Sequence, residues 1–172
     1  MNWTKTSAIS EIFSSVAILA TLIYLAVEFQ QNTEATRGDT RQAMLASDQQ
    51  FLELLINDPG LHLLGYEPEL SDEDKVRLGY FLITHLRMRE NNWLQYENGI
   101  LDATTWRAYR GSIVAVLSGP QTRYWWQNFA TERIFDSKFI SIVDELLANQ
   151  PVFDQSPHLA AFDRPNDGNV RE

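Results

Sequence analysis

The sequence predicts an all-α protein, in which an N-terminal membrane-anchor helix precedes an antiparallel helical bundle of about five helices. The first observation behind this prediction is an uncharged apolar run near the N-terminus, residues 12–27. The second is that apolar residues recur at helical spacing in later segments, between residues typical of helix caps. The third is that no stretch alternates apolar and polar residues as a strand does.

The predicted anchor is the run Ile12–Val27, sixteen residues without a charge between Glu11 and Glu28. At about 1.5 Å per residue it is roughly 24 Å long, against a hydrocarbon core of about 30 Å. Residues 8–10 and Phe29 extend it to spanning length if both carboxylates lie at the headgroups. We expect a single-pass segment in a bacterial inner membrane. The alternatives are a buried helix and a cleaved signal peptide, although no A-x-A cleavage site follows the run.

The charges around this run give a weak indication of its orientation. Lys5 and the amino terminus precede the run, whereas Arg37 and Arg41 follow it closely. Basic residues concentrate on the cytoplasmic side of membrane segments. The count therefore favours a cytoplasmic bundle slightly over a periplasmic one.

One face of the predicted anchor carries small residues at spacings of three and four, which places them on a single helical stripe. The members of this small-residue stripe are Ser7, Ser10, Ser14, Ala17 and Thr21. Small and hydroxyl-bearing side chains let helices approach closely in lipid and hydrogen-bond across the contact. The stripe predicts self-association or docking on a partner's helix. The alternative is an anchor that simply contains some Ser and Thr.

The residues after the anchor predict a second, amphipathic helical stretch. Apolar side chains return at Met44, Phe51 and Leu55, on one face of a helix. The turn-forming segment 57–60 ends this stretch. The anchor can run on into this helix as a stalk; the alternative is a break, for which Gly38-Asp39 is the most favourable place, because glycine weakens a helix interior.

Capping residues delimit the helices of the bundle. Ser71, Asp102 and Asp136 (or Ser137) are suited to N-caps, and Gly99 is suited to a helix end. The predicted helices are a short one within 61–70, then 72–97, 103–117, one that begins at Pro120, and one from 137 to about 148. Short connections between helices of this length favour antiparallel neighbours.

These elements divide the chain into three predicted parts. Residues 1–39 form the membrane anchor and its stalk, and residues 40–150 form the helical bundle domain. Residues 151–172 are rich in Pro, Asp and Asn and predict a flexible C-terminal tail.

The composition excludes several classes of function. Fourteen basic residues against 23 acidic ones give a formal net charge of −9, which repels phosphate backbones, so we expect no nucleic-acid partner. The absence of cysteine excludes disulfides, thiolate metal sites and cysteine nucleophiles. The three histidines lack the Glu-x-x-His spacing of di-iron bundles, and the glycines form no phosphate loop. We expect no metal, no cofactor and no catalytic residue.

Two charged residues interrupt the apolar faces of neighbouring predicted helices. Glu90 lies on the apolar stripe of the long helix, and Arg110 lies on that of the next. An antiparallel pair brings them together, and arginine is the natural partner of a buried carboxylate. His85 and Arg87 lie within one or two turns of Glu90. The four residues predict either an ion pair that fixes helix register or a polar pocket that binds a small ligand.

Adjacent aromatic residues also limit how the later helices pack. Trp125 and Trp126 point about 100° apart on a helix, so they cannot share one face. We expect one of them at a helix junction, an interface or the membrane surface.

Several sequence segments together resemble a known group of proteins. They are L-I-Y-L-A-V followed by Q-Q-N-T, then L-L-I-N-D-P-G, E-N-N-W-L-Q-Y-E-N-G-I-L-D-A-T-T-W and F-x-x-I-V-D-E-L-L. From about Ile9 to Leu147 the chain resembles a broad group of uncharacterised proteobacterial proteins with one N-terminal transmembrane segment and a helical domain. The resemblance implies an anchored bundle and no particular activity. Members of the group are often basic just after the apolar segment, where this chain has Glu28 and Glu34.

These features together predict a membrane-anchored interaction or scaffold protein that recognises a protein partner or a second copy of itself. The alternative is a small-molecule sensor or binding protein that uses the polar inter-helix pocket. An enzyme of unrecognised type is the third possibility.

Overall fold

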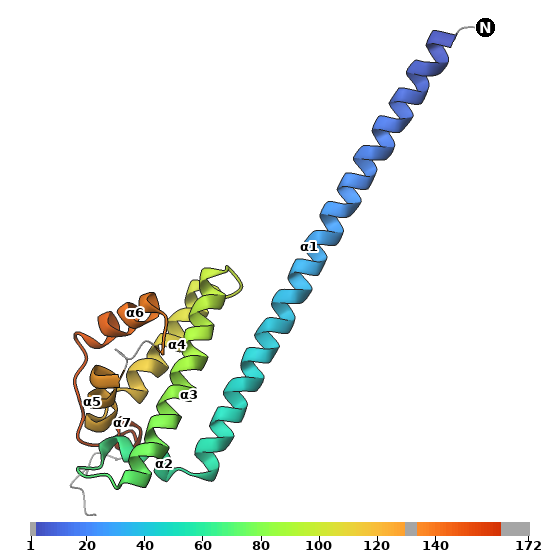
Figure 1. The fold of residues 1–172 in the computed structure, drawn as a ribbon. Coiled ribbons are helices and arrows are strands. Elements are labelled where there is room, and N and C mark those ends of the chain that lie inside the picture. Colours follow the sequence, from blue (N-terminus) through green and yellow to red (C-terminus); the bar gives the residue numbers. More distant parts are fainter. Residues whose placement is uncertain (1–2, 130–133, 163–172) are drawn as a thin grey trace, which may run out of the picture. The chain divides into compact units, whose positions relative to one another are not determined.

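A computed structural model describes residues 3–129 and 134–162, without the side chains of residues 3–13 and of Ala160. Within these residues the chain forms seven α-helices and one 3₁₀ helix, and it contains no strand (Figure 1). The predicted all-α class is therefore confirmed. The chain divides into two compact units, Met1–Ala43 and Met44–Glu172.

The first unit consists of the N-terminal part of helix α1 (Trp3–Asn57). Every large apolar side chain from Val16 to Phe29 is between 49% and 75% exposed. The hydroxyls of Thr33, Thr36 and Thr40 donate to backbone carbonyls four residues earlier, at 2.8–2.9 Å. The large apolar side chains of this unit are thus exposed, and these threonine hydroxyls are bonded within their own helix.

Helix α1 continues through Gly38, so the anchor runs into the amphipathic stretch as a stalk, and the alternative of a break at Gly38-Asp39 is wrong. A glycine in a helix interior costs only about 1 kcal/mol relative to alanine and keeps its own backbone N–H donor. No proline stands nearby to remove such a donor. The low helix propensity of Gly38 alone therefore does not interrupt the hydrogen bonds of α1.

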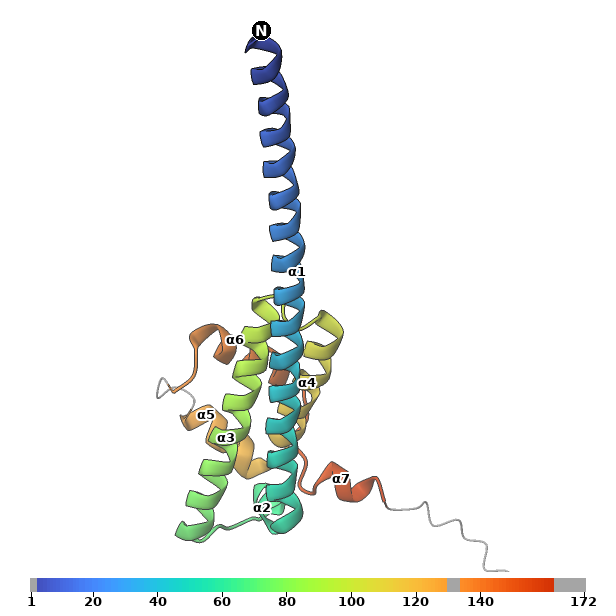
Figure 2. The same cartoon turned by 90° about the vertical axis from the view of Figure 1, so that its right-hand side faces the viewer.

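The second unit contains the end of α1 and all the later helices (Figures 1 and 2). These are α2 (Gly60–Leu63), the 3₁₀ helix η1 (Leu64–Tyr66), α3 (Asp72–Glu97), α4 (Ala103–Val116), α5 (Pro120–Phe129), α6 (Ser137–Leu147) and α7 (Pro157–Ala160). Helices α3 and α4 lie side by side as an antiparallel pair, as predicted.

The helices of the bundle begin at the predicted caps. The Ser71 hydroxyl accepts the backbone N–H of Asp74 at 3.1 Å. Asp102 accepts the N–H of Thr105, and Asp136 accepts that of Lys138, both at 2.8 Å. Each cap supplies an acceptor for an N–H group that has no partner within its helix. After α3, Gly99 adopts a φ of +69°, which favours glycine.

The core of the second unit lies between α3, α4, α5 and α6, with the end of α1 against one side. Its fully buried large side chains are Leu82, Leu86, Ile113, Leu117, Phe139 and Val143. Trp126 is buried and donates from Nε1 to Asp144 Oδ1 at 2.9 Å, whereas its neighbour Trp125 is only half-buried. One tryptophan thus enters the core and the other lies at its edge, as their adjacency predicts.

The structure describes the chain after α6 as far as residue 162. The backbone N–H of Phe153 donates to the Ser118 carbonyl at 2.9 Å, and Ser156 is buried. Helix α7 then forms over Pro157–Ala160. Residues 151–162 are therefore attached to the bundle, and the rest of the predicted tail lies outside the described residues.

Candidate functional site

Glu90, the central residue of the predicted polar site, is buried on α3 and 6% exposed. Its Oε2 accepts a hydrogen bond from Arg87 Nη1 at 2.7 Å, one turn earlier on the same helix. Its Oε1 accepts the backbone N–H of Asp136 at 2.5 Å. Asp136 caps α6, so the carboxylate lies at the positive end of that helix, where negative charge is favoured. Glu90 therefore connects α3 to α6.

The predicted contact between Glu90 and Arg110 is wrong. Arg110 is half-buried on α4, and within the described part of the chain it forms no hydrogen bond or ion pair with Glu90. The charged residue that α3 directs toward α4 is Arg89, whose Cζ lies 4.7 Å from the centre of the Tyr109 ring. The predicted contact is thus one residue off on each helix. Because one residue turns a helix by about 100°, α3 directs Glu90 to α6 and not to α4.

Arg89 belongs to a buried polar cluster between the end of α1, α3 and α4. Its side chain is 5% exposed and forms an ion pair with Asp48 of α1. Asn92 also contacts it when the amide oxygen faces Arg89 Nη1, at 3.1 Å. Burial, followed by the charge of Asp48, raises the pKa of Tyr109. The cluster holds the end of α1 against the α3–α4 pair.

His85, predicted as a ligand-binding residue, lies beside this cluster among aromatic rings. Its ring centre is 5.0 Å from that of Phe51. Neither ring nitrogen has a hydrogen-bond partner among the described residues. Burial, and then the charge of Arg89, lower the pKa of His85 to about 3, with the Ser112 backbone acting in the opposite direction. The imidazole is therefore neutral at neutral pH and packs as a core aromatic ring.

One feature of the sequence indicates this buried polar cluster, namely a charged residue within the apolar face of α1. On the second part of α1 the buried face contains Met44 and Phe51, and Asp48 falls between them on the same face. A charged residue inside an apolar stripe implies a buried partner, as it does for Glu90. The partner, Arg89, lies 41 residues away, and no local pattern identifies it.

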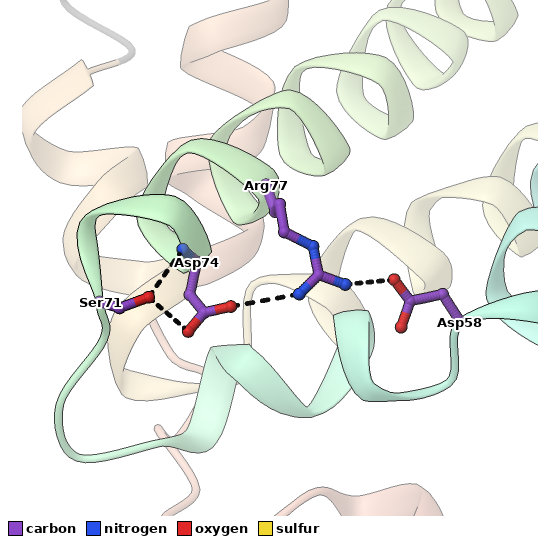
Figure 3. Close-up of polar contacts among 4 residues, drawn as sticks. All are labelled: Asp58, Ser71, Asp74 and Arg77. Atoms are coloured by element: carbon purple, nitrogen blue, oxygen red, sulfur yellow. Dashed lines mark hydrogen bonds and ion pairs between the residues drawn. The ribbon is translucent and has the colours of Figure 1, made fainter.

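A second chain of polar contacts joins α3 to the end of α1 at the surface (Figure 3). Arg77 pairs with Asp58 and also donates to Asp74 at 3.2 Å. Asp74 in turn accepts a hydrogen bond from the Ser71 hydroxyl at 2.7 Å. The hydrogen bond and charge of Asp58 raise the pKa of Arg77. These side chains are partly exposed, and their contacts connect the first turns of α3 to Ser71 and Asp58.

An apolar groove runs between α3 and α5 and consists of two adjoining hollows of about 330 and 280 Å³. Both hollows are lined by Lys75, Trp125 and Phe129. The other lining residues are Leu70, Leu78, Gln121, Tyr124 and Asn128 in the larger hollow, and Val76, Gly79, Tyr80 and Ile83 in the smaller. Val76, Tyr80 and Tyr124 are mostly exposed. This α3–α5 groove combines aromatic and aliphatic surface with few polar groups.

Helix α1 is the one helix in the described parts of the chain that is long and apolar enough to cross a membrane. An 18-residue window within Ser14–Asn57 has a mean hydropathy of 1.3, and none of it is buried. Of the predicted small-residue stripe, Ser14, Ala17 and Thr21 are exposed. The Thr21 hydroxyl donates to the Ala17 carbonyl of its own helix at 2.9 Å. The side chains of Ser7 and Ser10 lie outside the described residues.

No protein-family model, no curated protein and no solved structure matches this chain. Any functional assignment therefore depends on the surfaces and contacts described above.

Proposed function

We propose that this protein is a membrane-anchored helical interaction protein. The N-terminal part of α1 crosses a bacterial inner membrane once, and the bundle recognises another protein. The observation that carries the proposal is the exposure of every large apolar side chain from Val16 to Phe29. Soluble proteins rarely leave so large a contiguous apolar patch in water.

The distribution of these side chains around the helix favours lipid as their covering. At about 100° per residue, Val16 and Leu25 point to opposite sides of the helix, and Leu22 points between them. The face without large aliphatic residues is the one that carries Ser14, Ala17 and Thr21. One protein partner covers one face of a helix, whereas a bilayer covers all of them.

Fractionation of the full chain tests the anchor. The parent protein stays with membranes after a carbonate wash, because burial of each large apolar side chain is worth about 1.5–3 kcal/mol. Leu19→Arg with Leu22→Arg moves the chain to the supernatant, since each central arginine costs about 2.5–3.5 kcal/mol on insertion. The matched control, Gln31→Arg with Gln42→Arg, remains in the membrane. Parent protein found in the supernatant contradicts the anchor.

The α3–α5 groove is the surface that best supports recognition of a protein partner. Amphipathic helices bind in apolar grooves through spaced side-chain anchors, and tyrosine and tryptophan are frequent binding hot spots. A photo-crosslinking residue at Tyr124 is expected to form one defined adduct in cells, and a control probe at the exposed Glu145 of α6 is not. Tyr80→Arg then removes the adduct. Equal crosslinking from both probe positions counts against the groove.

The alternative, a small-molecule binding protein, relied on a polar pocket between Glu90 and Arg110, and no contact joins these two residues among the described ones. Its predicted pocket required Glu90 and Arg110 to face each other, and each Glu90 oxygen instead has a donor within α3 or at the start of α6. Glu90 therefore fits a structural role, as the ion-pair interpretation of this site proposed, with Arg87 and the Asp136 N–H in place of Arg110.

A further inference from the structure

The segment 151–162 has few described contacts with the rest of the bundle. Among its described side chains, Ser156 is the one that is buried, at 2% exposed. Val152, Phe153 and Leu159 are all more than 40% exposed. This segment, which we name the C-terminal strap, is held by a small number of contacts, so a change at one of them has a large effect on its docking.

Those contacts converge on His62 of α2. His62 Nε2 lies 3.2 Å from the hydroxyl of Ser156. The ring of His158, on α7, meets the His62 ring edge-on with centres 5.4 Å apart. At the other end of the strap, the Phe153 N–H donates to the Ser118 carbonyl at 2.9 Å. One half-buried imidazole thus contacts both the buried serine and a second imidazole of the strap.

We propose that the C-terminal strap is a pH-sensitive latch: it docks over α2 while His62 is neutral, and it detaches when His62 takes up a proton. A positive charge on the His62 ring is disfavoured first by burial and then by the charge of His158 beside it. The other titratable rings near His62 do not compensate. Tyr66 of η1 bonds through its hydroxyl to Ser118 at 2.7 Å, and His85 of α3 is held neutral by burial.

The direction of the effect follows from the electrostatics of the docked strap. Burial, followed by the charge of His158, lowers the pKa of His62 in the docked state. When the strap detaches, both causes weaken and the pKa of His62 returns toward its ordinary value near 6.5. The detached state then binds more protons, so docking is complete above about pH 6.5 and weakens as the pH falls below it. The ratio of docked to detached strap changes by up to about tenfold per pH unit for each linked proton.

Hydrogen exchange of the full chain in detergent micelles tests the latch between pH 8 and pH 5.5. After correction for intrinsic exchange rates, the protection of amides in 151–162 is expected to fall as the pH falls. Protection of α6 amides serves as the internal control and stays constant. His62→Gln keeps a neutral hydrogen-bonding group toward Ser156 and is expected to keep the strap protected at pH 5.5.

A second variant covers the case in which His62→Gln disturbs the fold. His158 is exposed, so His158→Gln leaves the core intact and removes only the repulsion. It is expected to reduce the loss of protection at pH 5.5 without abolishing it. Strap protection that does not change with pH in the parent chain overturns the proposal. So does a loss of protection that is equal in the parent chain and both variants.

Discussion

Two segments of helix α1 differ in what surrounds their apolar side chains. Between Val16 and Phe29 all the large apolar side chains are at least 49% exposed. Between Met44 and Leu55 the apolar side chains on one face pack against the bundle core, while Leu45 and Leu52 remain exposed. A continuous helix therefore passes from a segment without described tertiary contacts to one that a core holds.

The difference shows that the pattern around a helix, more than its apolar content, indicates its surroundings. An apolar stripe needs one protein layer, and burial of that stripe supplies most of the stability of a helix in water. A segment that is apolar on nearly all faces needs a solvent that is apolar on all sides. The two segments should therefore respond differently to the same substitution.

The largest expected difference comes from a matched pair of leucines. Leu86 is completely buried in α3, whereas Leu22 is 58% exposed in α1. Leu86→Ala should lower the free energy of unfolding by about 2–5 kcal/mol, because it leaves a cavity in the core. Leu22→Ala should change it by about 0.5 kcal/mol or less. Urea unfolding of the full chain in mild detergent, followed by tryptophan fluorescence, measures both. Equal losses would mean that the two segments do not differ in packing.

The ion pair between Asp48 and Arg89 tests how firmly the second segment is held. Arg89→Met should cost about 2–3 kcal/mol, below the full cost of breaking a buried pair because Asp48 is partly exposed. Asp48→Leu combined with Arg89→Met should recover much of this loss. In a double-mutant cycle the exposed pair Arg77–Asp58 is the control, and its coupling should be much smaller than that of Asp48–Arg89. Equal coupling energies in the two pairs would contradict the burial of the Asp48–Arg89 ion pair.

A smaller effect distinguishes the observed register of α3 from the predicted one. Glu90→Ala leaves the Asp136 N–H without its acceptor and should cost about 1–2 kcal/mol. Arg110→Ala should cost about 0.5 kcal/mol or less, because no described contact joins it to Glu90. A strong coupling between the two substitutions would show that Glu90 and Arg110 are in contact, as the sequence predicted.

The smallest effect concerns Gly38, in the segment of α1 without described tertiary contacts. A methyl group added there meets no atom within 4 Å. Gly38→Ala should therefore stabilise the helix locally by up to about 1 kcal/mol. Slower amide exchange around residue 38, with unchanged bundle stability, is the expected result. Faster exchange would show that the glycine accommodates a bend.

The helices were predictable because their boundary signals are local. Ser71, Asp102 and Asp136 each cap a helix within three residues of their own position, and Gly99 supplies a positive φ angle just after α3. The predicted bounds of the long helix, 72–97, are those observed. Apolar periodicity also placed Glu90 on the buried face of α3.

The contacts between helices were less predictable, because they depend on rotation and on distant residues. A register in which Glu90 faces Arg110 satisfies the same short stripes as one in which Arg89 faces Tyr109, although the two differ by about 100°. The contact between His62 and Ser156 spans 94 residues and leaves no periodic trace in the sequence. This distance explains why the strap was predicted as part of a loose tail.

The proposed membrane span is tested most directly by a single-cysteine scan, for which the absence of native cysteine provides a clean background. Cysteines at Leu19 and Leu22 should react with a membrane-impermeant maleimide only after detergent is added. A cysteine at Asn32 or Thr36 should react in sealed vesicles of one orientation and not in vesicles of the other. Equal labelling at Leu19 and Asn32 in sealed vesicles would contradict the span, and with it the proposal of an anchored protein.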